Sequence, residues 1–573
     1  MKERFMNLAT CLIAMSLSGC SGENGAKNQE TAEPASVVKQ QLANTVFTNG
    51  NIYTVNAAQP KAQAVALKDG EIIFVGDDSQ VQHYIGDNTQ VINLGGKMMM
   101  PGIHDVHIHP LESGSDATHF ALNEAETDVE YYIDDIIDAA AQNPQAQWLI
   151  GYGHSIEALL DAQRNPRDIL DDAVPDRPVI IMEQTSHSMW VNSKALSLAN
   201  ITGSSQDPIG GVISRDSFNR PDGILYDNAG NIVMDIAMQA QNNAAEKDYL
   251  GFVEYTQGEL NKHGITSISD ARTYWQRDHL STWQKIADNR ELTMRVSLGL
   301  WAYPEANDSV QIAKLLEMYQ ANTDSLLKVN QIKFYMDGIL VNTTAAMHAP
   351  YEFDLLGLHE NKGVNYFTPQ RLEKYLKALE PTGFDFNIHA IGDRGITEAL
   401  DAIENASNGK GRHRLTHLEV MDPKDYARFA RLNVIADAQV AGDFTKAEHW
   451  RENIDYIGAE RSDNIIPIGS LLDNNARLTL SSDWNVSTFN PFVGIAHAIT
   501  RTPQEIPLAD AIQAYTINGA YAMRQDDITG SIEVGKRGDL IVLDRDLFTS
   551  SAAQIKATRV EMTWLDGELI YKR

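Results

Sequence analysis

The stretch GIHDVHIHP, residues 102–110, places three histidines and an aspartate within six positions. Its alternation predicts a β-strand over 102–109, and in a strand residues i and i+2 project to the same side. Asp105, His107 and His109 therefore face one way, and two imidazoles held like this can bind one divalent metal ion. A lone His-x-His pair also arises by chance in a chain with 16 histidines, so other parts of the sequence must support the interpretation.

Seven further apolar segments with the character of strands follow, with amphipathic stretches such as 369–383 between them. Eight strand–helix repeats predict an α/β fold, a (β/α)₈ TIM-like barrel whose functional groups lie at the C-terminal ends of its strands. A long excursion, about 115–245, is expected to be an insertion over the barrel mouth after the first strand. The eight strands are expected at 102–109, 264–271, 294–301, 331–338, 384–393, 414–419, 433–439 and 477–484.

Short alternating apolar runs flank the barrel at both chain ends. The turn signals Asn49–Gly50, Asp69–Gly70 and Asp566–Gly567 predict β-hairpins there. We therefore expect one small β-sandwich domain assembled from both ends, with the hydrolase-like barrel between them. The expected ranges are 44–100 with 528–573 for the β-sandwich and 101–527 for the barrel.

The first twenty residues are typical of a bacterial secretory signal. Lys2 and Arg4 precede an apolar stretch that is too short to span a bilayer. The ending Leu17–Cys20 is similar to a lipobox, which implies cleavage before Cys20 and lipidation of its thiol; an ordinary signal peptide is the alternative. Residues 21–43 suit a flexible linker. We expect a secreted protein that is periplasmic or anchored to the outer membrane as a lipoprotein.

Charge and cysteine content exclude several classes of protein. The chain has 77 acidic and 47 basic residues and a formal charge of −30, which argues against nucleic acid or an anionic membrane surface as partner. Both cysteines, Cys11 and Cys20, lie in the signal segment, so the folded body has no disulfide, thiolate ligand or cysteine nucleophile. The expected partner is a small-molecule substrate, with a membrane contacted only through the lipid anchor. Assembly as a homodimer is left open.

Three more candidate metal ligands lie near the ends of later strands. His389 lies at the fifth strand, His417 at the sixth and Asp483 at the eighth. Each alone is better explained as a core or loop residue. Together with His107 and His109, however, they match the nitrogen and oxygen ligands that zinc-like metals prefer. The sequence predicts a metal centre at the barrel mouth, with Asp105 supporting the ligands rather than binding the metal.

At this point the chain resembles the amidohydrolase superfamily, and within it amidohydrolase family 3, with its YtcJ-like and N-substituted formamide deformylase-like members. The resemblance runs in order through essentially the whole mature chain. It implies that His107 and His109 bind one metal, that His389 and His417 form the second site, and that Asp483 binds metal and acts as the acid/base group. Its motifs include MMMPGIHDVHIHP (98–110), HSMWVNSKAL (187–196), NIHAIGDRG (387–395), LTHLE (415–419) and SSDW (481–484).

Lys333 lies in the fourth strand, beside these ligands. An ammonium group near a dication is strongly repelled, so this lysine must be neutral, turned away or chemically converted. The resemblance implies a carboxylated Lys333 that bridges two metal ions. The alternative is a lysine that pairs with a carboxylate such as Asp337. The expected cofactor is a divalent metal, with zinc favoured, and one ion or two remain open.

The insertion is expected to contribute to substrate recognition. His187 is a candidate to polarise the substrate carbonyl or to hold the substrate. Thr185–Ser186 and Asn485 depart from the pattern expected of the family, so the substrate is not carried over from it. The candidate substrate-binding residues are Tyr152, Trp190, Arg394 and Trp484.

These features predict a metal-dependent hydrolase that cleaves a non-peptide carbon–nitrogen bond of the amide type with metal-activated water. An N-acyl amine, an N-formyl amine or a cyclic amide fits best. One alternative is a lactone or ester hydrolase with the same metal centre. The other is a surface-anchored binding or regulatory protein that has lost catalysis.

Overall fold

Eight parallel strands form a barrel, and each overlaps one of the strands expected from the sequence. The predicted barrel fold is therefore confirmed. Helices cover the outside, which explains why the strands β8, β15, β16, β17 and β18 are buried along their whole length. In sheet order the strands are β8 (Ile103–Ile108), β15 (Ile265–Thr273), β16 (Arg295–Trp301), β17 (Leu327–Tyr335), β18 (Asp385–Ala390), β19 (Arg414–His417), β20 (Ile435–Ala438) and β21 (Arg477–Leu480).

The first and last barrel strands meet at their C-terminal ends. The His109 amide donates to the Trp484 carbonyl at 2.8 Å, and the Asp483 amide donates to the His107 carbonyl at 2.8 Å. The Asp105 carboxylate adds a third link, because it accepts from the Ser482 amide at 3.1 Å. Asp105 thus braces the joint between β8 and the segment after β21, in line with the supporting role expected for it.

The computed structural model describes residues 41–116, 119–126, 128–322, 324–353, 355–442, 445–446, 449 and 454–573. The signal segment with Cys20 and nearly all of the linker lie outside the described residues. Residues Leu42–Arg573 form one compact unit. Within the described part of the chain, no helix combines the length and the apolar character needed to cross a membrane.

The helices alternate with the strands, as expected. One of them, α12 (Pro369–Leu379), lies in the segment 369–383, which is expected to be amphipathic. Its Thr368 side chain caps the helix by accepting from the Arg371 amide, and Pro369 starts the first turn. The other helices outside the insertion are α1 (Asp78–Val81), α2 (Pro110–Asp116), α8 (Ala244–Leu250), α9 (Gln257–Lys262), α10 (His279–Asp288), α11 (Asp308–Met318), α13 (Asp393–Ala406), α14 (Tyr426–Leu432), α16 (Ile454–Ile457), α17 (Ala459–Ser462), α18 (Ile468–Asp473), α19 (Pro491–Ala498), α20 (Leu508–Ala514), α21 (Ile517–Ala522) and α22 (Ala552–Lys556).

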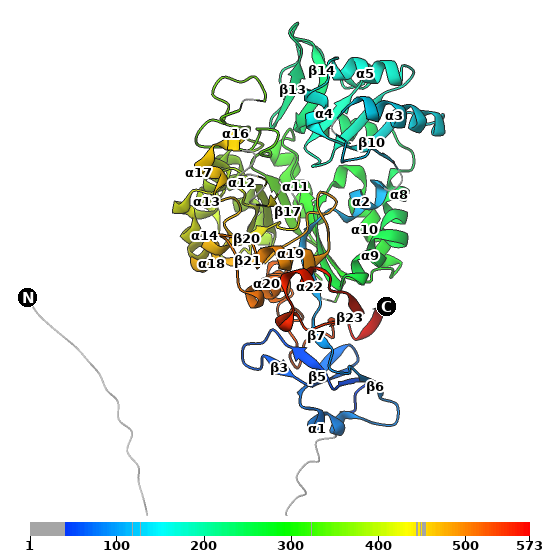
Figure 1. The fold of residues 1–573 in the computed structure, drawn as a ribbon, viewed down its shortest axis with the longest axis vertical. Helices are drawn as coiled ribbons and strands as arrows, with labels where there is room; N and C mark the ends of the chain where they lie inside the picture. The colour runs from blue at the N-terminus through cyan, green and yellow to red at the C-terminus, as the bar shows by residue number, and fades with distance from the viewer. Residues whose placement is uncertain are drawn as a thin grey trace, which may run out of the picture. The chain divides into compact units, whose positions relative to one another are not determined.

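The insertion between β8 and β15 forms a mixed sheet of its own, drawn in cyan to teal in Figure 1. Both faces of this sheet are packed: Val179 and Ile181 point into one apolar cluster, whereas Ile180 and Met182 point into another. The sheet order is β13 (Gly211–Arg215), β14 (Pro221–Asp227), β12 (Ser188–Val191), β11 (Val179–Glu183), β10 (Leu149–His154) and β9 (Phe120–Ala121), and its helices are α3 (Glu130–Gln142), α4 (Ile156–Leu160), α5 (Pro166–Ala173), α6 (Ser193–Leu198) and α7 (Asn228–Gln239).

Strands from the two chain ends lie side by side, the blue and red elements of Figure 1. They form two sheets with a shared apolar core, in which Phe47 and Trp564 pack edge to face at 5.2 Å. One sheet has the order β5 (Glu71–Gly76), β4 (Ala64–Lys68), β1 (Thr45–Thr48) and β6 (Gln90–Asn93); the other has β24 (Glu568–Lys572), β23 (Val560–Leu565), β22 (Leu540–Leu543), β7 (Met98–Pro101), β2 (Asn51–Tyr53) and β3 (Lys61–Ala62).

Two of the three predicted hairpins are present. Asp69–Gly70 joins β4 to β5 and Asp566–Gly567 joins β23 to β24, with positive φ at both residues of each turn, as two-residue hairpins require. The hairpin at Asn49–Gly50 is wrong, because β1 and β2 belong to different sheets. The chain turns there to cross between the two layers. A Cβ atom on Gly50 would lie only 2.7 Å from the end of the Leu94 side chain, so a larger residue here would have to displace that side chain.

Candidate metal centre

The side chains predicted as metal ligands converge at the C-terminal end of the barrel. His107 lies in β8 and His109 directly after it, His389 in β18, His417 at the last position of β19 and Asp483 just beyond β21. Because all eight strands run parallel, these ends meet at one mouth. Residues that are hundreds of positions apart in the chain are brought together in this way.

Asp483 is the point where the ligands meet. Its Oδ1 lies 2.9 Å from His109 Nε2 and 3.3 Å from His107 Nε2, and its Oδ2 lies 3.9 Å from His417 Nδ1. His107, His417 and Asp483 each offer one ligand atom within 4.8 Å of the others. This spacing fits the coordination of a single ion by several side chains.

His389 and His417 extend the cluster, with their ring centres 4.4 Å apart. His389 Nε2 lies 3.0 Å from the Gly338 carbonyl, so Nε2 is the protonated nitrogen and Nδ1 keeps its lone pair. His389 Nδ1 and His417 Nε2 are both buried, with no hydrogen-bond partner in the described part of the chain. Buried polar atoms are rarely unpaired, and imidazole lone pairs are what zinc requires. These residues therefore fit a metal ion.

Burial sets the protonation states that a metal centre needs. It lowers the pKa of His107 and of His389 well below 6.5 and that of His417 to about 3, so the imidazoles are neutral ligands. Burial alone would raise the pKa of Asp483, but His107 and the other imidazoles hold it well below its usual value. The set thus offers neutral nitrogen and anionic oxygen, the donors that zinc prefers in proteins without cysteine ligands.

Lys333 lies within the cluster, fully buried in β17, with Nζ 3.2 Å from His107 Nε2. Burial lowers its pKa well below 10.5, so the amine is neutral. The alternative pairing with Asp337 is not observed, because that carboxylate accepts from the backbone amides of Ala346, Ile391 and Gly392 at 2.8–3.0 Å. Lys333 is therefore an uncharged nucleophilic amine beside the predicted ligands.

The backbone at two of these residues is held in an uncommon conformation. The φ angles are 79° at His417 and 53° at Asp483, in the left-handed region that non-glycine residues rarely occupy. Such strain persists only where the surrounding structure enforces it, and it is concentrated at functional sites. It aims these two side chains across the mouth rather than along their strands.

A hydrogen-bond relay orients His107. Its Nδ1 lies 2.9 Å from Thr416 Oγ1, which donates to Asp437 at 2.8 Å. Asp437 is fully buried in β20 and also accepts from Thr479 and Ser481. The relay keeps the proton on Nδ1 and points the Nε2 lone pair into the cluster.

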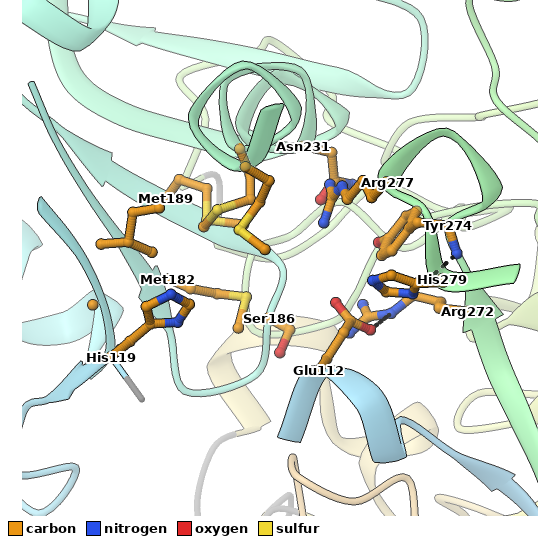
Figure 2. A pocket seen from close by; sticks show the side chains of 14 residues that line it. Glu112, His119, Met182, Ser186, Met189, Asn231, Arg272, Tyr274, Arg277 and His279 are labelled. Carbon is orange, nitrogen blue, oxygen red and sulfur yellow. Dashed lines mark hydrogen bonds and ion pairs between the residues drawn. The ribbon is translucent and has the colours of Figure 1, made fainter. Parts of the chain in front are cut away.

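His109 lies near a buried ion pair, Glu112 with Arg272, which Figure 2 draws. Its Nδ1 lies 3.7 Å from Glu112 Oε2, and Glu112 accepts from Arg272 Nε at 3.1 Å. Burial alone would raise the pKa of Glu112, but Arg272 holds it below its usual value. The carboxylate therefore stays ionised beside the histidine, an arrangement that makes a ligating imidazole more basic.

His187 reaches the cluster from the insertion. Its Nδ1 lies 2.6 Å from Asp227 Oδ1, which leaves Nε2 to face the site, and its ring is 5.3 Å from that of His389. Tyr366 donates to the same Asp227 oxygen at 3.3 Å. A cavity of about 50 Å³ is lined by His187 together with His389, His417 and Asp483. The predicted catalytic pair His187 and Asp483 thus lines one space.

The family model that describes the amidohydrolase family matches residues 90–571 of this chain. The chain belongs to the amidohydrolase family. Over 555 residues it is 26% identical to the putative amidohydrolase YtcJ of Bacillus subtilis, covering 92% of this chain and 99% of YtcJ. It is also 26% identical to the N-substituted formamide deformylase of Arthrobacter pascens, covering 93% and 99%.

Among solved structures, an uncharacterized metal-dependent hydrolase from Pyrococcus horikoshii OT3 has a TM-score of 0.70 and 23% sequence identity, covering 89% of this chain and 99% of that one. The likeness supports the fold. Family membership makes the chain an amidohydrolase-type hydrolase, for which metal-dependent reaction at a carbon–nitrogen bond is the expected class of chemistry.

Two candidate substrate-binding residues of this amidohydrolase lie elsewhere. Trp190 is fully buried in the core of the insertion, where Nε1 donates to the Pro166 carbonyl at 2.8 Å. It fills space between sheet and helices and does not form a wall of the cavity beside Asp483. The Arg394 guanidinium donates to the carbonyls of Met347 and Lys362 and to Asn365. It braces the loop after β17 and is not among the residues that line the cavity beside Asp483, so its role in binding substrate stays a prediction.

Tyr152 and Trp484, the other two candidates, line a second cavity of about 200 Å³ next to the first. Trp484 follows Asp483 directly and packs edge to face on Phe489 at 4.9 Å, which fixes its ring. These two side chains are placed where a bound substrate of the amidohydrolase can contact them.

Sequence reasoning missed the residues that orient the ligands. Asp227, Glu112, Thr416 and Asp437 come from the insertion, a helix start and two barrel strands. Their spacing in the chain carries no signal, because each acts through a contact made only in the folded barrel. The one local hint is Thr416, which stands beside His417 in the strand RLTH.

Proposed function

We propose that this amidohydrolase cleaves a non-peptide carbon–nitrogen bond of the amide type in a small molecule. The observation that carries the proposal is the convergence of four neutral histidines and ionised Asp483 on one mouth, with His389 Nδ1 and His417 Nε2 left unpaired. A bound divalent metal, for which we propose zinc, acidifies a water molecule and polarises the substrate carbonyl.

Asp483 is the proposed acid/base group. It accepts a proton from the water as the water oxygen adds to the carbonyl carbon. It then returns that proton to the nitrogen as the carbon–nitrogen bond breaks, so the products are a carboxylic acid and an amine. Its position between His107, His109 and His417 keeps it ionised and able to accept.

His187 is the proposed electrophile. Its Nδ1 is engaged by Asp227, so Nε2 faces the cavity that Asp483 also lines. With Asp227 holding the Nδ1 proton, the doubly protonated ring would donate a hydrogen bond from Nε2 to the carbonyl oxygen, where negative charge develops. His187 and Asp483 line the same cavity, so both can reach one carbonyl group.

We further propose that Lys333 is carboxylated when the centre is loaded. Its neutral Nζ would bond to the carbon of carbon dioxide and release one proton, which gives a carbamate. This exchanges a group that repels cations for an anionic bridge beside His107. The proposal favours two ions over one.

The experiment that tests the function compares matched amides and esters. Protein loaded with zinc is assayed on N-formyl amines, N-acetyl amines and cyclic amides, each paired with the corresponding ester or lactone, before and after chelation. We expect metal-dependent hydrolysis with the amides preferred, restored when zinc is added back. Preference for the esters would favour a lactone or ester hydrolase. No turnover by fully loaded protein would leave a binding or regulatory role.

The N-terminal segment adds a proposed location. Secretion followed by lipid attachment at Cys20 would place the barrel outside the cytoplasm, held by the linker. Metabolic labelling with a radioactive fatty acid should mark the chain, and Cys20→Ser should abolish the label and release the protein from membranes.

A further inference from the structure

A cavity of about 200 Å³ beside the predicted metal centre has a distinctive lining. Three aromatic side chains, Tyr152, Tyr255 and Trp484, share it with the carboxylates of Glu124 and Glu183. No lysine or arginine lines this cavity within the described part of the chain. Aromatic faces and carboxylates together are the surroundings that stabilise an organic cation.

This cavity adjoins the reacting groups. Trp484 is the residue after Asp483, and its carbonyl accepts from the His109 amide at 2.8 Å. Ser113, which also lines the cavity, donates to the His109 carbonyl at 2.8 Å. The segment 183–187 connects the cavity, at Glu183, to the metal cavity, at His187. A larger cavity of about 600 Å³ shares lining residues with both, so one small molecule could reach from this cavity to Asp483.

Glu183 supplies an independent sign of a missing partner. The side chain is 1% exposed, and its Oε2 accepts from both the amide and the hydroxyl of Thr185. Its Oε1 is buried with no hydrogen-bond partner among the described residues. Burial raises the pKa of Glu183 to about 8. Without a partner the group therefore stays mainly protonated near neutral pH, and a bound cation would stabilise its ionised form.

The larger cavity that shares residues with this one is also lined by acidic side chains. Glu124 and Glu183 also line a larger cavity of about 600 Å³, to which Glu157 adds a third carboxylate. Burial raises the pKa of Glu124 as well. Together with the formal charge of −30, this concentration of acidic groups attracts cations and repels anions.

The cavity in Figure 2 shows why the opposite preference is excluded. Arg272 and Arg277 line one side of this space, across from Met182 and Met189, and its volume is about 40 Å³. Arg272 is paired with Glu112 and Arg277 with Asp235. Both guanidinium groups are therefore already ion-paired and offer an anionic part of a substrate no uncompensated positive charge.

We propose that the cavity formed by Tyr152, Tyr255, Trp484, Glu124 and Glu183 binds a cationic group of the substrate, an ammonium or quaternary ammonium carried near the scissile bond. This deepens the proposed function and rests on it, because the substrate class becomes small amides that bear a positive charge. Glu183 provides the counter-charge and the aromatic faces enclose the alkyl groups around the cation.

Equilibrium binding tests the proposal without turnover. The zinc-loaded chain is titrated calorimetrically with choline and with 3,3-dimethylbutan-1-ol, which has the same shape and no charge. We expect choline to bind about tenfold more tightly, the magnitude of a partly desolvated cation–π contact. Equal affinity for the two compounds, or a preference for the neutral one, would overturn the proposal.

Substitutions test whether this cavity causes the preference for choline over the neutral alcohol. Glu183→Gln keeps the shape and removes the charge, so the preference for choline should fall to near one. Tyr255→Ala, at a side chain that is 55% exposed and safe for folding, should reduce it severalfold. Glu130→Gln, an exposed acid at the start of α3, should leave it unchanged. An unchanged preference in Glu183→Gln would rule out this site.

A further assay distinguishes failure of the cation site from failure of the proposed amide hydrolysis. N-formyl amides bearing a trimethylammonioethyl or a 3,3-dimethylbutyl group are compared by kcat/KM. Hydrolysis of both at equal rates, together with no choline preference, would reject the cationic substrate and leave the hydrolase intact. Selective choline binding without hydrolysis of either amide would reject the amide chemistry and leave the cation site intact.

Discussion

The two ends of the barrel bury charged groups in opposite ways. At the N-terminal end, Arg295 donates to Asp539 at 2.7 and 3.1 Å and to Asp566 at 2.5 Å, and the Asp566 amide donates back to Asp539 at 2.8 Å. At the C-terminal end, Lys333 forms no ion pair within the described residues, and His389 Nδ1 and His417 Nε2 have no partner there. The charges of the Arg295 cluster are matched by two carboxylates, whereas the two histidine nitrogens at the other end are left without a partner.

The difference separates stability from function. A buried ion pair whose every atom is engaged ties the barrel to the strands of the chain ends, and losing one partner leaves an unsolvated charge. Buried atoms without partners destabilise the fold, so they persist where a ligand completes them. Substitutions at the two ends should therefore have different consequences, one for activity and one for the free energy of unfolding.

The largest expected effect is at Asp483. Asp483→Asn removes the proton acceptor and should lower kcat about 10³–10⁴-fold, because general acid–base catalysis contributes up to that much. Thermal unfolding and most of the bound metal should be retained, as checked by metal analysis and circular dichroism. Asp172→Asn, at a carboxylate that is 72% exposed, is the control. A fully active Asp483→Asn enzyme would remove Asp483 from the mechanism.

Arg295→Met should act on stability instead. It leaves Asp539 buried without its partner and should reduce the free energy of unfolding by about 3–5 kcal/mol. The folded fraction should keep its kcat/KM. Urea denaturation measures the loss, and Arg431→Met, at an exposed pair with Glu404, should cost far less stability. If both variants lost equal stability, the contrast between the two ends would not hold.

Thr416→Val cuts the relay behind His107. Metal affinity or activity should fall about 10–100-fold, the usual cost of losing a residue that orients a ligand. Thr416→Ser keeps the hydroxyl and should stay near the wild type. Competition with a chelator gives the affinity. Equal behaviour of the two variants would mean that the hydroxyl does not position His107.

The smallest effect is the pH dependence at Glu183. Burial, with a further contribution from Glu157, raises its pKa to about 8 from 4.5. A raised carboxyl pKa means that stability present below pH 4.5 is lost as the pH rises towards 8, because the unfolded chain ionises the carboxyl group while the folded state still keeps it protonated. Glu183→Gln removes that loss, so its melting temperature should match the wild type near pH 4.5 and exceed it near pH 8. If the melting temperatures of Glu183→Gln and the wild type changed equally with pH, Glu183 would not be the cause of the loss of stability.

The sequence was sufficient for the barrel and the candidate ligands. Alternation within GIHDVHIH predicts both β8 and the shared direction of His107 and His109, since strand geometry acts over two residues. Trp190 and Arg394 could not be placed in this way. An aromatic in a strand can face a core or a pocket, and an arginine after a strand can face substrate or backbone carbonyls. The choice is made by tertiary contacts such as Pro166 and Met347.

The Asn49–Gly50 turn shows the same limit for the fold. Asn–Gly favours a tight turn locally, but it does not determine whether the next strand returns to the same sheet. Packing decides that, through the close approach of Leu94 to Gly50. Glu183, at the end of an otherwise apolar strand, is the one polar residue in VIIME.

The hydrogen bonds from His109 to Trp484 and from Asp483 to His107 have a consequence for how the enzyme matures. They are the seam of the barrel, and they join segments from nearly opposite ends of the polypeptide. Contacts between such remote segments carry a high entropic cost and form late in folding. The enzyme can therefore become active only after the first and last barrel strands have paired. A metal ion bound by residues of both strands would stabilise that pairing.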